Sequence, residues 1–362
     1  MSSPVSVSLP VSLLIPGLIW PTQALSDLTH DLSLPALSRL LACGRLVAQP
    51  GTTCSELVAQ KLGATQPLPS AALRRITLGR PADNHDWLCL DPVHLGFVEH
   101  ALTIGDPQDL ALTRDEAEAF AVALAPTFSE FGEIEIATPQ AWHLRLKSDH
   151  GNVSAPALHD VIGGRADRGL AALDLSWRQA LNEAQMLLHS HPFNQDRERN
   201  GRLTVNSVWP WGAGALHSQT PPPAPDRPAL LWTDSLDLRG LGQHLGLTIA
   251  PLPTHWMPPP ATTLIVIDTL SQPARRADAI AWRTELERLE ENWFAPLVAD
   301  LQRGCPARLR IDFISDAPDK QGLAFDCSRA DLLFSRMAFW RKPTSILRLA
   351  THSASTQAQS RA

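Results

Sequence analysis

The chain has no tyrosine, no C-x-x-C pair and no cluster of basic residues among its 362 residues. Its five cysteines are odd in number and widely spaced, which disfavours a disulfide framework or a zinc knuckle and suits a reducing cytoplasm. Its net charge is -6 at pH 7, whereas nucleic-acid binding requires a basic face that neutralises phosphates. We therefore expect no nucleic-acid partner.

The N-terminus also lacks the features of an export signal. Residues 1–21 are apolar, but no basic segment opens them and prolines interrupt them. A signal peptide begins with basic residues, and a membrane-spanning helix needs about 20 uninterrupted apolar residues. The sequence predicts a cytoplasmic protein with no membrane partner.

Composition and apolar periodicity describe a globular protein of alternating strands and helices. Hydrophobic residues make up 44% of the chain, and its length suits about two domains or one large domain with an insertion. Strands are expected at 11–15, 87–95, 134–136, 142–146, 230–234, 263–268 and 307–314, and helices at 31–45, 55–62, 113–124, 176–188, 235–247 and 278–301. This alternation predicts an α/β fold with a mainly parallel sheet flanked by helices.

The densest polar chemistry lies in residues 181–214, LNEAQMLLHSHPFNQDRERNGRLTVNSVWPWGAG, which we call the signature segment. A helix should end before Pro192, and the remainder is expected to form a loop. Amides and guanidinium groups beside glycines are typical of a polar or anionic pocket. The candidate ligand-binding residues are His191, Asn194, Arg197, Asn206, Trp209, Trp211, Gly212 and Gly214. Asn and Gly are equally ordinary turn residues and tryptophans often cap a core, so binding and structure stay equally open.

Two shorter patterns contain residues that can form metal or acid–base sites. Asp91 and His94 form a D-x-x-H pair, and His189 and His191 form an H-x-H pair. Metal sites need three or four ligands, and neither pair has a further ligand close in sequence. We favour a structural turn in which Asp91 accepts hydrogen bonds from backbone N–H groups.

The signature segment resembles a known family. HPFNQDRERNGRLTVNSVWPWGAG, together with DPVHL at 91–95 and WHLRL at 142–146, is similar to the RpfE-type regulatory proteins of proteobacteria, whose members are often labelled phosphoglycerate mutase. The likeness covers most of residues 10–350. It is more distantly similar to the archaeal-type cofactor-independent phosphoglycerate mutases of the alkaline-phosphatase superfamily.

This resemblance implies an alkaline-phosphatase-like core with an inserted α+β cap region. The expected parts are residues 1–86 as the first part of the core, 87–217 as the cap with the signature segment, 218–350 as the second part of the core, and 351–362 as a disordered tail.

The resemblance also implies where catalytic groups would stand. In the superfamily the first strand ends in an Asp-Gly pair whose Asp binds a metal, and here the pair is Pro16-Gly17. Ser70 is the candidate for the serine nucleophile, although a helix N-cap is the simpler interpretation. Asp268 and Asp316 are the candidate metal ligands, and both lack the histidines that accompany them in the mutases.

Three hypotheses follow. The first is an RpfE-type regulatory protein, a catalytically degenerate mutase relative that binds a small phosphorylated or anionic molecule without a cofactor. The second is an active phosphoglycerate mutase or phosphatase that uses Mn²⁺ or Zn²⁺. The third is a scaffolding protein whose tryptophans contact a regulatory protein partner.

Overall fold

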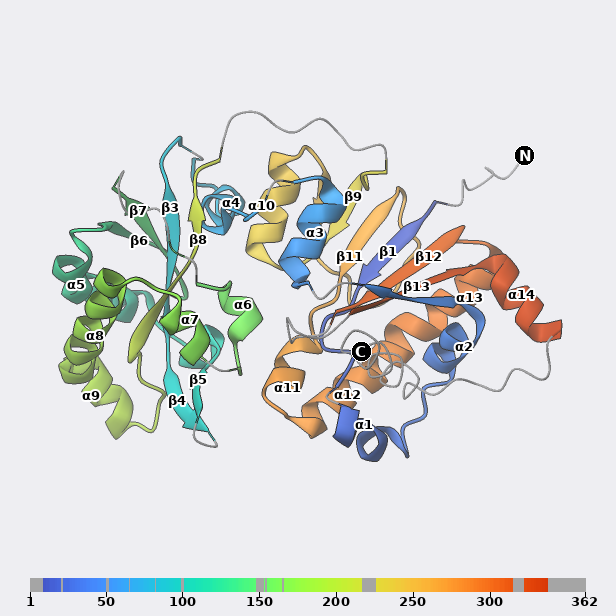
Figure 1. Cartoon of the computed structure of the whole chain (residues 1–362), viewed down its shortest axis with the longest axis horizontal. Helices are drawn as coiled ribbons and strands as arrows, with labels where there is room; N and C mark the ends of the chain where they lie inside the picture. Colours follow the sequence, from blue (N-terminus) through green and yellow to red (C-terminus); the bar gives the residue numbers. More distant parts are fainter. Residues whose placement is uncertain are drawn as a thin grey trace, which may run out of the picture. The chain divides into compact units, whose positions relative to one another are not determined.

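The structure is a computed structural model, and it describes only part of the chain. The described residues are 9–20, 22–49, 52–64, 66–81, 83–98, 101–147, 153, 155–164, 166–216, 226–314 and 322–337. Asp316 and the tail at 351–362 lie outside them. The chain forms two compact units: unit 1 comprises 1–63, 223–234 and 247–362, and unit 2 comprises 64–222 and 235–246 (Figure 1).

Unit 1 contains a seven-stranded sheet in the order β10-β9-β11-β1-β12-β13-β2. All neighbouring pairs are parallel except those of β13, which runs against β12 and β2. The sheet is thus mainly parallel, as expected, and β13 makes it mixed. The strands are β1 (Val11–Leu14), β2 (Arg45–Gln49), β9 (Leu230–Trp232), β10 (Thr248–Ala250), β11 (Thr263–Val266), β12 (Arg308–Phe313) and β13 (Gly322–Ser328).

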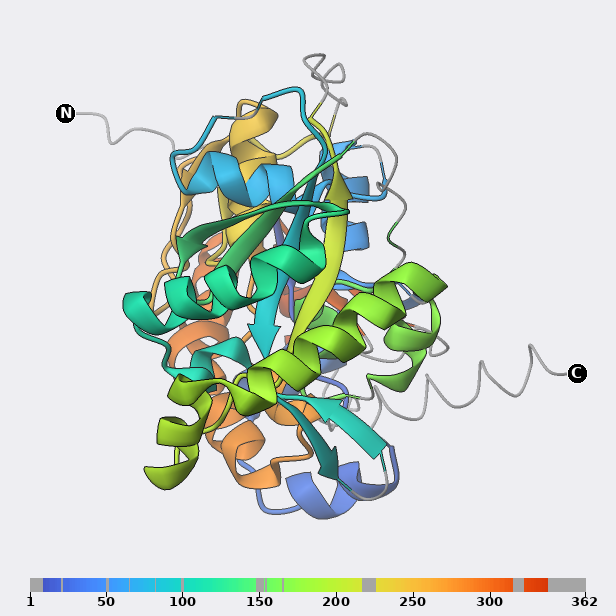
Figure 2. The same ribbon diagram turned by 90° about the vertical axis from the view of Figure 1, so that its left-hand side faces the viewer.

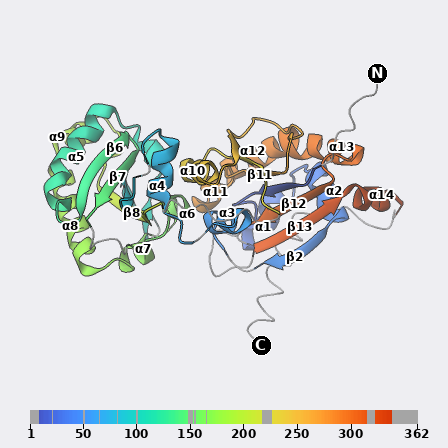
Figure 3. The same cartoon turned by 90° about the horizontal axis from the view of Figure 1, so that it is seen from above.

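Helices cover this sheet and form the core of unit 1. They include α1 (Thr22–Thr29), α2 (Pro35–Cys43), α3 (Cys54–Leu62), α11 (Ser271–Arg275), α12 (Ala279–Leu289), the π-helical turn η2 (Glu290–Phe294), α13 (Ala295–Arg303) and α14 (Arg329–Met337). Apolar side chains of α2, α12 and α13 pack on Leu13, Ile265 and Ile311 of the central strands, and α12 and α13 run along one side of the sheet (Figure 3). Burial of this apolar surface is the main stabilising contribution to the unit.

Unit 2 is built on a four-stranded antiparallel sheet in the order β6-β7-β3-β8. Its strands are β3 (Trp87–Val93), β6 (Gly132–Thr138), β7 (Ala141–Leu146) and β8 (Ser207–Gly214), and a separate hairpin joins β4 (Leu95–Val98) to β5 (Ala101–Ile104). The helices are α4 (Ser70–Thr77), η1 (Pro107–Leu110), α5 (Arg114–Phe128), α6 (Leu158–Val161), α7 (Asp167–Ala171), α8 (Leu175–Ser190), α9 (Pro192–Arg199) and α10 (Leu236–His244).

The two faces of the unit 2 sheet differ in character. One face packs on α5 and α8 through an apolar core that contains Phe120, Trp142 and Trp177, and these helices lie in front of the sheet in Figure 2. The other face carries α4, which contacts β3, β8 and α10. Gly240 lets α10 approach α4 closely, because a Cβ there would lie 2.0 Å from the backbone oxygen of Leu73.

The structure differs from the sequence expectations in two places. The expected loop of the signature segment is helix α9 followed by strand β8, because proline is well tolerated at the first position of a helix and Ser207–Gly214 pairs with β3. Residues 64–86 and 235–246 belong to unit 2 rather than to the sheet of unit 1, since α4 and α10 pack on each other and α4 packs on β3 and β8. In the described residues, no helix is long and apolar enough to cross a bilayer.

Candidate functional site

Three polar residues of the signature segment are engaged within the fold. The amide of Asn194 donates to the carbonyls of Leu188 and Val205 at 2.7 Å each and accepts from the backbone N–H of Val205. The amide of Asn206 pairs with both backbone groups of Leu95, at 2.7 and 2.8 Å. These contacts fix α9 and β8 in place.

Arg197 has the same structural role. Its side chain is 1% exposed, its Nη1 donates to both carboxylate oxygens of Glu116 at 2.9 Å, and it also donates to the carbonyls of Leu110 and Leu203. A buried charge is tolerated only when it is paired and hydrogen-bonded, and these partners meet that need. If Arg197, Asn194 and Asn206 formed a ligand pocket, their side chains would converge on one point. In the structure each of them binds a different part of the backbone, and Arg197 also binds Glu116.

His191 and Trp209 also pack inside unit 2. His191 accepts the N–H of Phe193 as the N-cap of α9 and stacks with that ring, and burial lowers the pKa of His191. Trp209 is fully buried, donates to the carbonyl of Pro156 at 3.0 Å and leaves no room for a Cβ at Gly169.

The two expected glycines lie against the start of α4. Gly212 has φ +62, and a Cβ there would lie 2.7 Å from the Cβ of Ser70. Gly214 has φ +141 and faces Pro69 at 3.0 Å. The absence of side chains at Gly212 and Gly214 therefore permits β8 to approach α4 closely, in a backbone conformation that other residues rarely adopt.

Ser70 is not the N-cap of α4, because Pro69 holds that position and Ser70 is the first helical residue. Its hydroxyl donates to Oδ2 of Asp237 at 3.2 Å, and the other oxygen of Asp237 accepts from Ser235. Both Ser70 and Asp237 are buried. No carboxylate lies next to Ser70 in the sequence. The carboxylate that binds its hydroxyl belongs to Asp237 of α10, 167 residues away.

The expected metal ligands of unit 1 can be examined only in part. Pro16 follows β1 and offers no donor atom, while Asp268 follows β11, whose end lies beside the Gly17 turn. Asp316 falls outside the described residues. Among the residues that are described, no group of three or more His, Cys, Asp or Glu side chains has metal-binding geometry. At the position of the first metal ligand that the resemblance implies, the side chain of Pro16 has no group that can bind a metal.

Asp91 organises the polar face of the unit 2 sheet. It lies in the middle of β3 and accepts from Nη1 and Nη2 of Arg74 at 2.6 and 2.9 Å, from the indole of Trp211 at 2.8 Å and from the backbone N–H of Trp142 at 3.1 Å. Burial alone would lower the pKa of Arg74, but the charge and hydrogen bonds of Asp91, together with Cys89 and Asp237, raise the pKa above its ordinary value. One carboxylate thus fixes both Arg74 and Trp211. The expected turn at Asp91 is absent, although its bond to a backbone N–H is present.

The neighbouring row of side chains crosses all four strands. Strand register places Glu135, His143, Cys89 and Trp211 side by side. His143 is fully buried and neither ring nitrogen has a partner in the described structure, so burial, reinforced by Arg74 and Arg75, lowers its pKa well below the ordinary value. Burial raises the pKa of Cys89, which makes its thiol unreactive.

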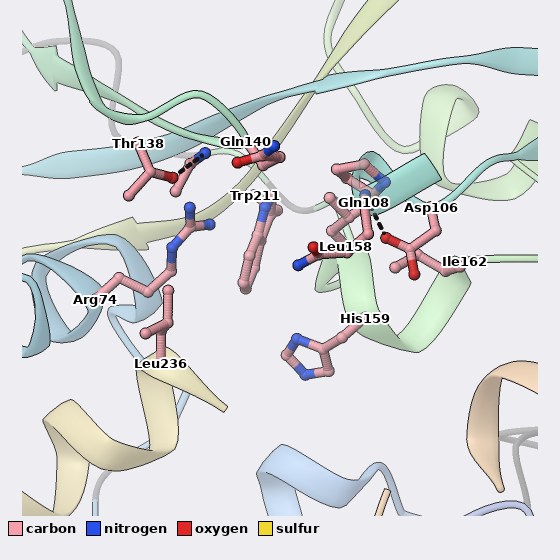
Figure 4. Close-up of a pocket in the computed structure, with 12 residues that line it drawn as sticks. Arg74, Asp106, Gln108, Thr138, Gln140, Leu158, His159, Ile162, Trp211 and Leu236 are labelled. Atoms are coloured by element: carbon pink, nitrogen blue, oxygen red, sulfur yellow. Dashed lines mark hydrogen bonds between the residues drawn. The ribbon is translucent and has the colours of Figure 1, made fainter. Parts of the chain in front are cut away.

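A cavity of about 220 Å³ opens at one end of this polar face. Figure 4 shows Arg74 on one side of Trp211, with Gln108 and His159 on the other. All its lining residues belong to unit 2: Arg74, Asp106, Pro107, Gln108, Thr138, Gln140, Ala141, Leu158, His159, Ile162, Trp211 and Leu236. Of the candidate ligand-binding residues predicted from the sequence, Trp211 lines this cavity.

Sequence reasoning missed most of the cavity residues. Arg74, Gln108 and Gln140 come from α4, η1 and the β6–β7 turn, and no motif unites them. One signal was available: Asp91 lies inside WLCLDPV, an apolar run whose every residue is buried. A carboxylate in such a run needs a cationic partner, which pointed to an arginine on a packed helix.

The comparisons with known proteins give limited information. The sequence matches no protein-family model and no curated protein. A cofactor-independent phosphoglycerate mutase from Thermoplasma acidophilum DSM 1728 is similar in structure, with a TM-score of 0.42 and 16% identity over 88% of this chain and 90% of that chain. The PH0037 protein from Pyrococcus horikoshii gives a TM-score of 0.49 and 12% identity over 89% and 87% of the two chains. Both scores lie below 0.5, so these similarities decide neither activity nor membership in the RpfE-type family.

Proposed function

We propose that this protein binds a small phosphorylated or otherwise anionic molecule in the cavity beside Arg74 and acts through that binding. In this proposal it is an RpfE-type regulatory protein and a catalytically degenerate relative of the cofactor-independent phosphoglycerate mutases. The proposal concerns unit 2, which contains every residue that lines the cavity.

The observation that carries the proposal is the place of Arg74 in the wall of the cavity. A guanidinium group has five N–H donors arranged in a planar fork. Asp91 takes one N–H from each Nη and so fixes the group, while the Nε is buried without a partner in the described structure. The Nη hydrogens that Asp91 does not use can therefore bind the oxygens of a carboxylate or phosphate.

Two further features favour binding over phosphoryl transfer. The hydroxyl of Ser70 is buried and donates to Asp237, so it does not face a substrate. Pro16 supplies no ligand where the resemblance places the first metal-binding carboxylate. Phosphoryl transfer requires an accessible nucleophile and charge neutralisation at the transferring group.

The test is calorimetric titration of the full chain with 3-phosphoglycerate and with inorganic phosphate. Arg74→Lys keeps the positive charge but removes the planar fork, so it should weaken binding at least about tenfold. Arg75→Lys is the matched control, because Arg75 is the next residue of α4, pairs with Glu135 at 2.7 Å and does not line the cavity. It should leave the affinity within about twofold of the wild type.

The same preparations separate the alternatives. Equal losses in the two lysine variants, or no binding of either probe, would overturn the proposal. Turnover of 3-phosphoglycerate after loading with Mn²⁺ or Zn²⁺, abolished by Ser70→Ala, would instead establish the active enzyme. Absence of both binding and turnover would leave the scaffolding hypothesis, in which a regulatory protein is the partner.

A further inference from the structure

The cavity is lined by neutral polar side chains as well as by the cation of Arg74. Two side-chain carboxamides line it, from Gln108 on η1 and Gln140 in the turn between β6 and β7. Neither carboxamide has a hydrogen-bond partner in the part of the chain that the structure describes. In Figure 4 they lie on different sides of the cavity, with Trp211 between them and Arg74 near its ring.

The chemistry of a carboxamide selects its partner. Each presents an acceptor oxygen and a donor NH₂ group, whereas phosphate and carboxylate oxygens only accept. An anion alone offers no donor to either carboxamide oxygen, and the exposed Gln108 and the half-buried Gln140 would keep water as their partner. A hydroxyl group both donates and accepts, so a carbon chain with several hydroxyls complements Gln108 and Gln140.

The remaining walls agree with this choice. Leu158, Ile162 and Leu236 supply apolar surface for C–H groups. The hydroxyl of Thr138 accepts from the backbone N–H of Ala141 at 3.0 Å, which leaves its own hydrogen available to a ligand oxygen. Asp106 also lines the cavity, and its carboxylate accepts the backbone N–H of Gln108 at 2.7 Å.

The volume of the cavity is compatible with a small ligand. A space of about 220 Å³ accommodates a short carbon chain with its hydroxyls.

We propose that the ligand of this cavity is a small polyol that carries an acidic group, such as a sugar phosphate or a sugar acid, and that Gln108 and Gln140 recognise its hydroxyls. The inference rests on the proposed function, because Arg74 holds the acidic group. It adds that hydroxyl groups, and not the acid alone, determine which molecules bind.

Matched ligand pairs test this inference on the full chain. Ribose 5-phosphate is compared with pentyl phosphate, and gluconate with hexanoate, since each pair shares its acid and carbon number and differs mainly in oxygenation. In the wild type the hydroxylated member should bind at least about tenfold more tightly, because only its hydroxyls form hydrogen bonds with the two carboxamides. Gln108→Leu and Gln140→Leu should each reduce this ratio to about threefold or less.

Controls separate recognition from folding. Gln243→Leu changes an exposed glutamine of α10 outside the cavity and should preserve the ratio. The thermal midpoints of both cavity variants should match the wild type, since their carboxamides have no protein partner.

Each remaining outcome has a distinct meaning. Equal binding of pentyl phosphate and ribose 5-phosphate, with both lost in Arg74→Lys, would overturn the inference and leave the proposed function intact. A preference for hydroxyls that survives both leucine variants would also overturn it. Failure of all four compounds to bind would overturn the inference, whereas the proposed function is decided by the titrations with 3-phosphoglycerate and inorganic phosphate.

Discussion

At the residue scale, the polar side chains of the signature segment stabilise the fold of unit 2. Asn194 joins the end of α8 to the chain before β8, and Asn206 joins β8 to the first residue of β4. Arg197 neutralises Glu116, which also forms the capping box of α5. Side-chain amides and guanidinium groups saturate buried backbone carbonyls as readily as they bind ligands, and here they do the former.

Arg197→Met tests this structural role. The substitution leaves the buried carboxylate of Glu116 with only the partly exposed Arg202 as a cationic partner. We expect the free energy of unfolding of unit 2 to fall by about 3–5 kcal/mol, while the affinity of the folded protein for 3-phosphoglycerate stays the same. Hydrogen exchange of β3 amides during urea unfolding measures the first quantity.

Arg199→Met is the control for that substitution. Arg199 lies two residues further along α9 and makes an exposed ion pair with Asp196, so its loss should cost less than about 1 kcal/mol. Lost ligand affinity in folded Arg197→Met would show that Arg197 also belongs to the binding site.

At the scale of elements, α4 connects the fold to the cavity. It carries Arg74, contacts β3 and β8, and packs against α10. The close contact depends on Gly240, whose missing side chain makes room for the backbone of Leu73. The position of Arg74 therefore depends on a helix that lies more than 150 residues away in the sequence.

Gly240→Ala tests this dependence. In an ordinary helix the change stabilises by about 0.5–1 kcal/mol. Here the new Cβ would lie 2.0 Å from the Leu73 oxygen, so α10 must shift and we expect destabilisation of about 1–3 kcal/mol, together with weaker binding of 3-phosphoglycerate. Thermal unfolding and calorimetry measure the two effects.

Gln243→Ala, at an exposed position of the same helix, provides the control and should change neither quantity. If Gly240→Ala stabilised the protein, the tight contact between α4 and α10 would be refuted.

At the scale of the whole molecule, two buried groups determine how stability depends on pH. Burial, with Arg74 and Arg75, lowers the pKa of His143 well below 6.5, so the unfolded chain takes up a proton that the folded chain does not. Burial by itself raises the pKa of Glu116. The backbone N–H of Thr113 and the side chains of Arg197 and Arg202 lower it by more, so the pKa lies below the ordinary value of 4.5.

The signs of these pKa shifts define two pH ranges in which the stability of the protein changes. The contribution of His143 is fully present above pH 6.5 and is lost as the pH falls below that value; burial of His191 and His244 acts in the same direction. The contribution of Glu116 is present above pH 4.5 and is lost as the pH falls below it. We therefore expect stability to decline from pH 6.5 downward and more steeply below pH 4.5.

His143→Leu isolates the first pH range. Between pH 6.5 and 4.5 it should reduce the slope of unfolding free energy by up to about 1.4 kcal/mol per pH unit, the value for one proton. At pH 7 it should be neutral or stabilising, because it removes a buried polar ring without partners. Urea unfolding at a series of pH values measures both, and an unchanged slope would mean that His143 is protonated in the folded state.

The sequence by itself determined the local features of this protein. Thr113 and Glu116, three residues apart in the sequence, form the capping box of α5, and Pro35 and Gly44 stand at the two ends of α2. These features depend on side chains and backbone groups within a few residues of each other, so the order of residues is enough to predict them. Apolar periodicity similarly predicted the positions of β1, α8 and β12. The alternation of strands and helices then predicted the mainly parallel sheet.

Only the tertiary structure decided how distant groups meet. The first turn of α2 has no cap of its own, and Glu290 accepts its N–H groups from 254 residues away. Asp91 meets Arg74 because α4 packs on β3, and Trp211 joins them through the pairing of β8 with β3. Strand register and helix packing are set by the burial of the whole apolar surface, which no short motif records. For that reason the signature segment revealed Trp211 but not the arginine and glutamines that complete the cavity.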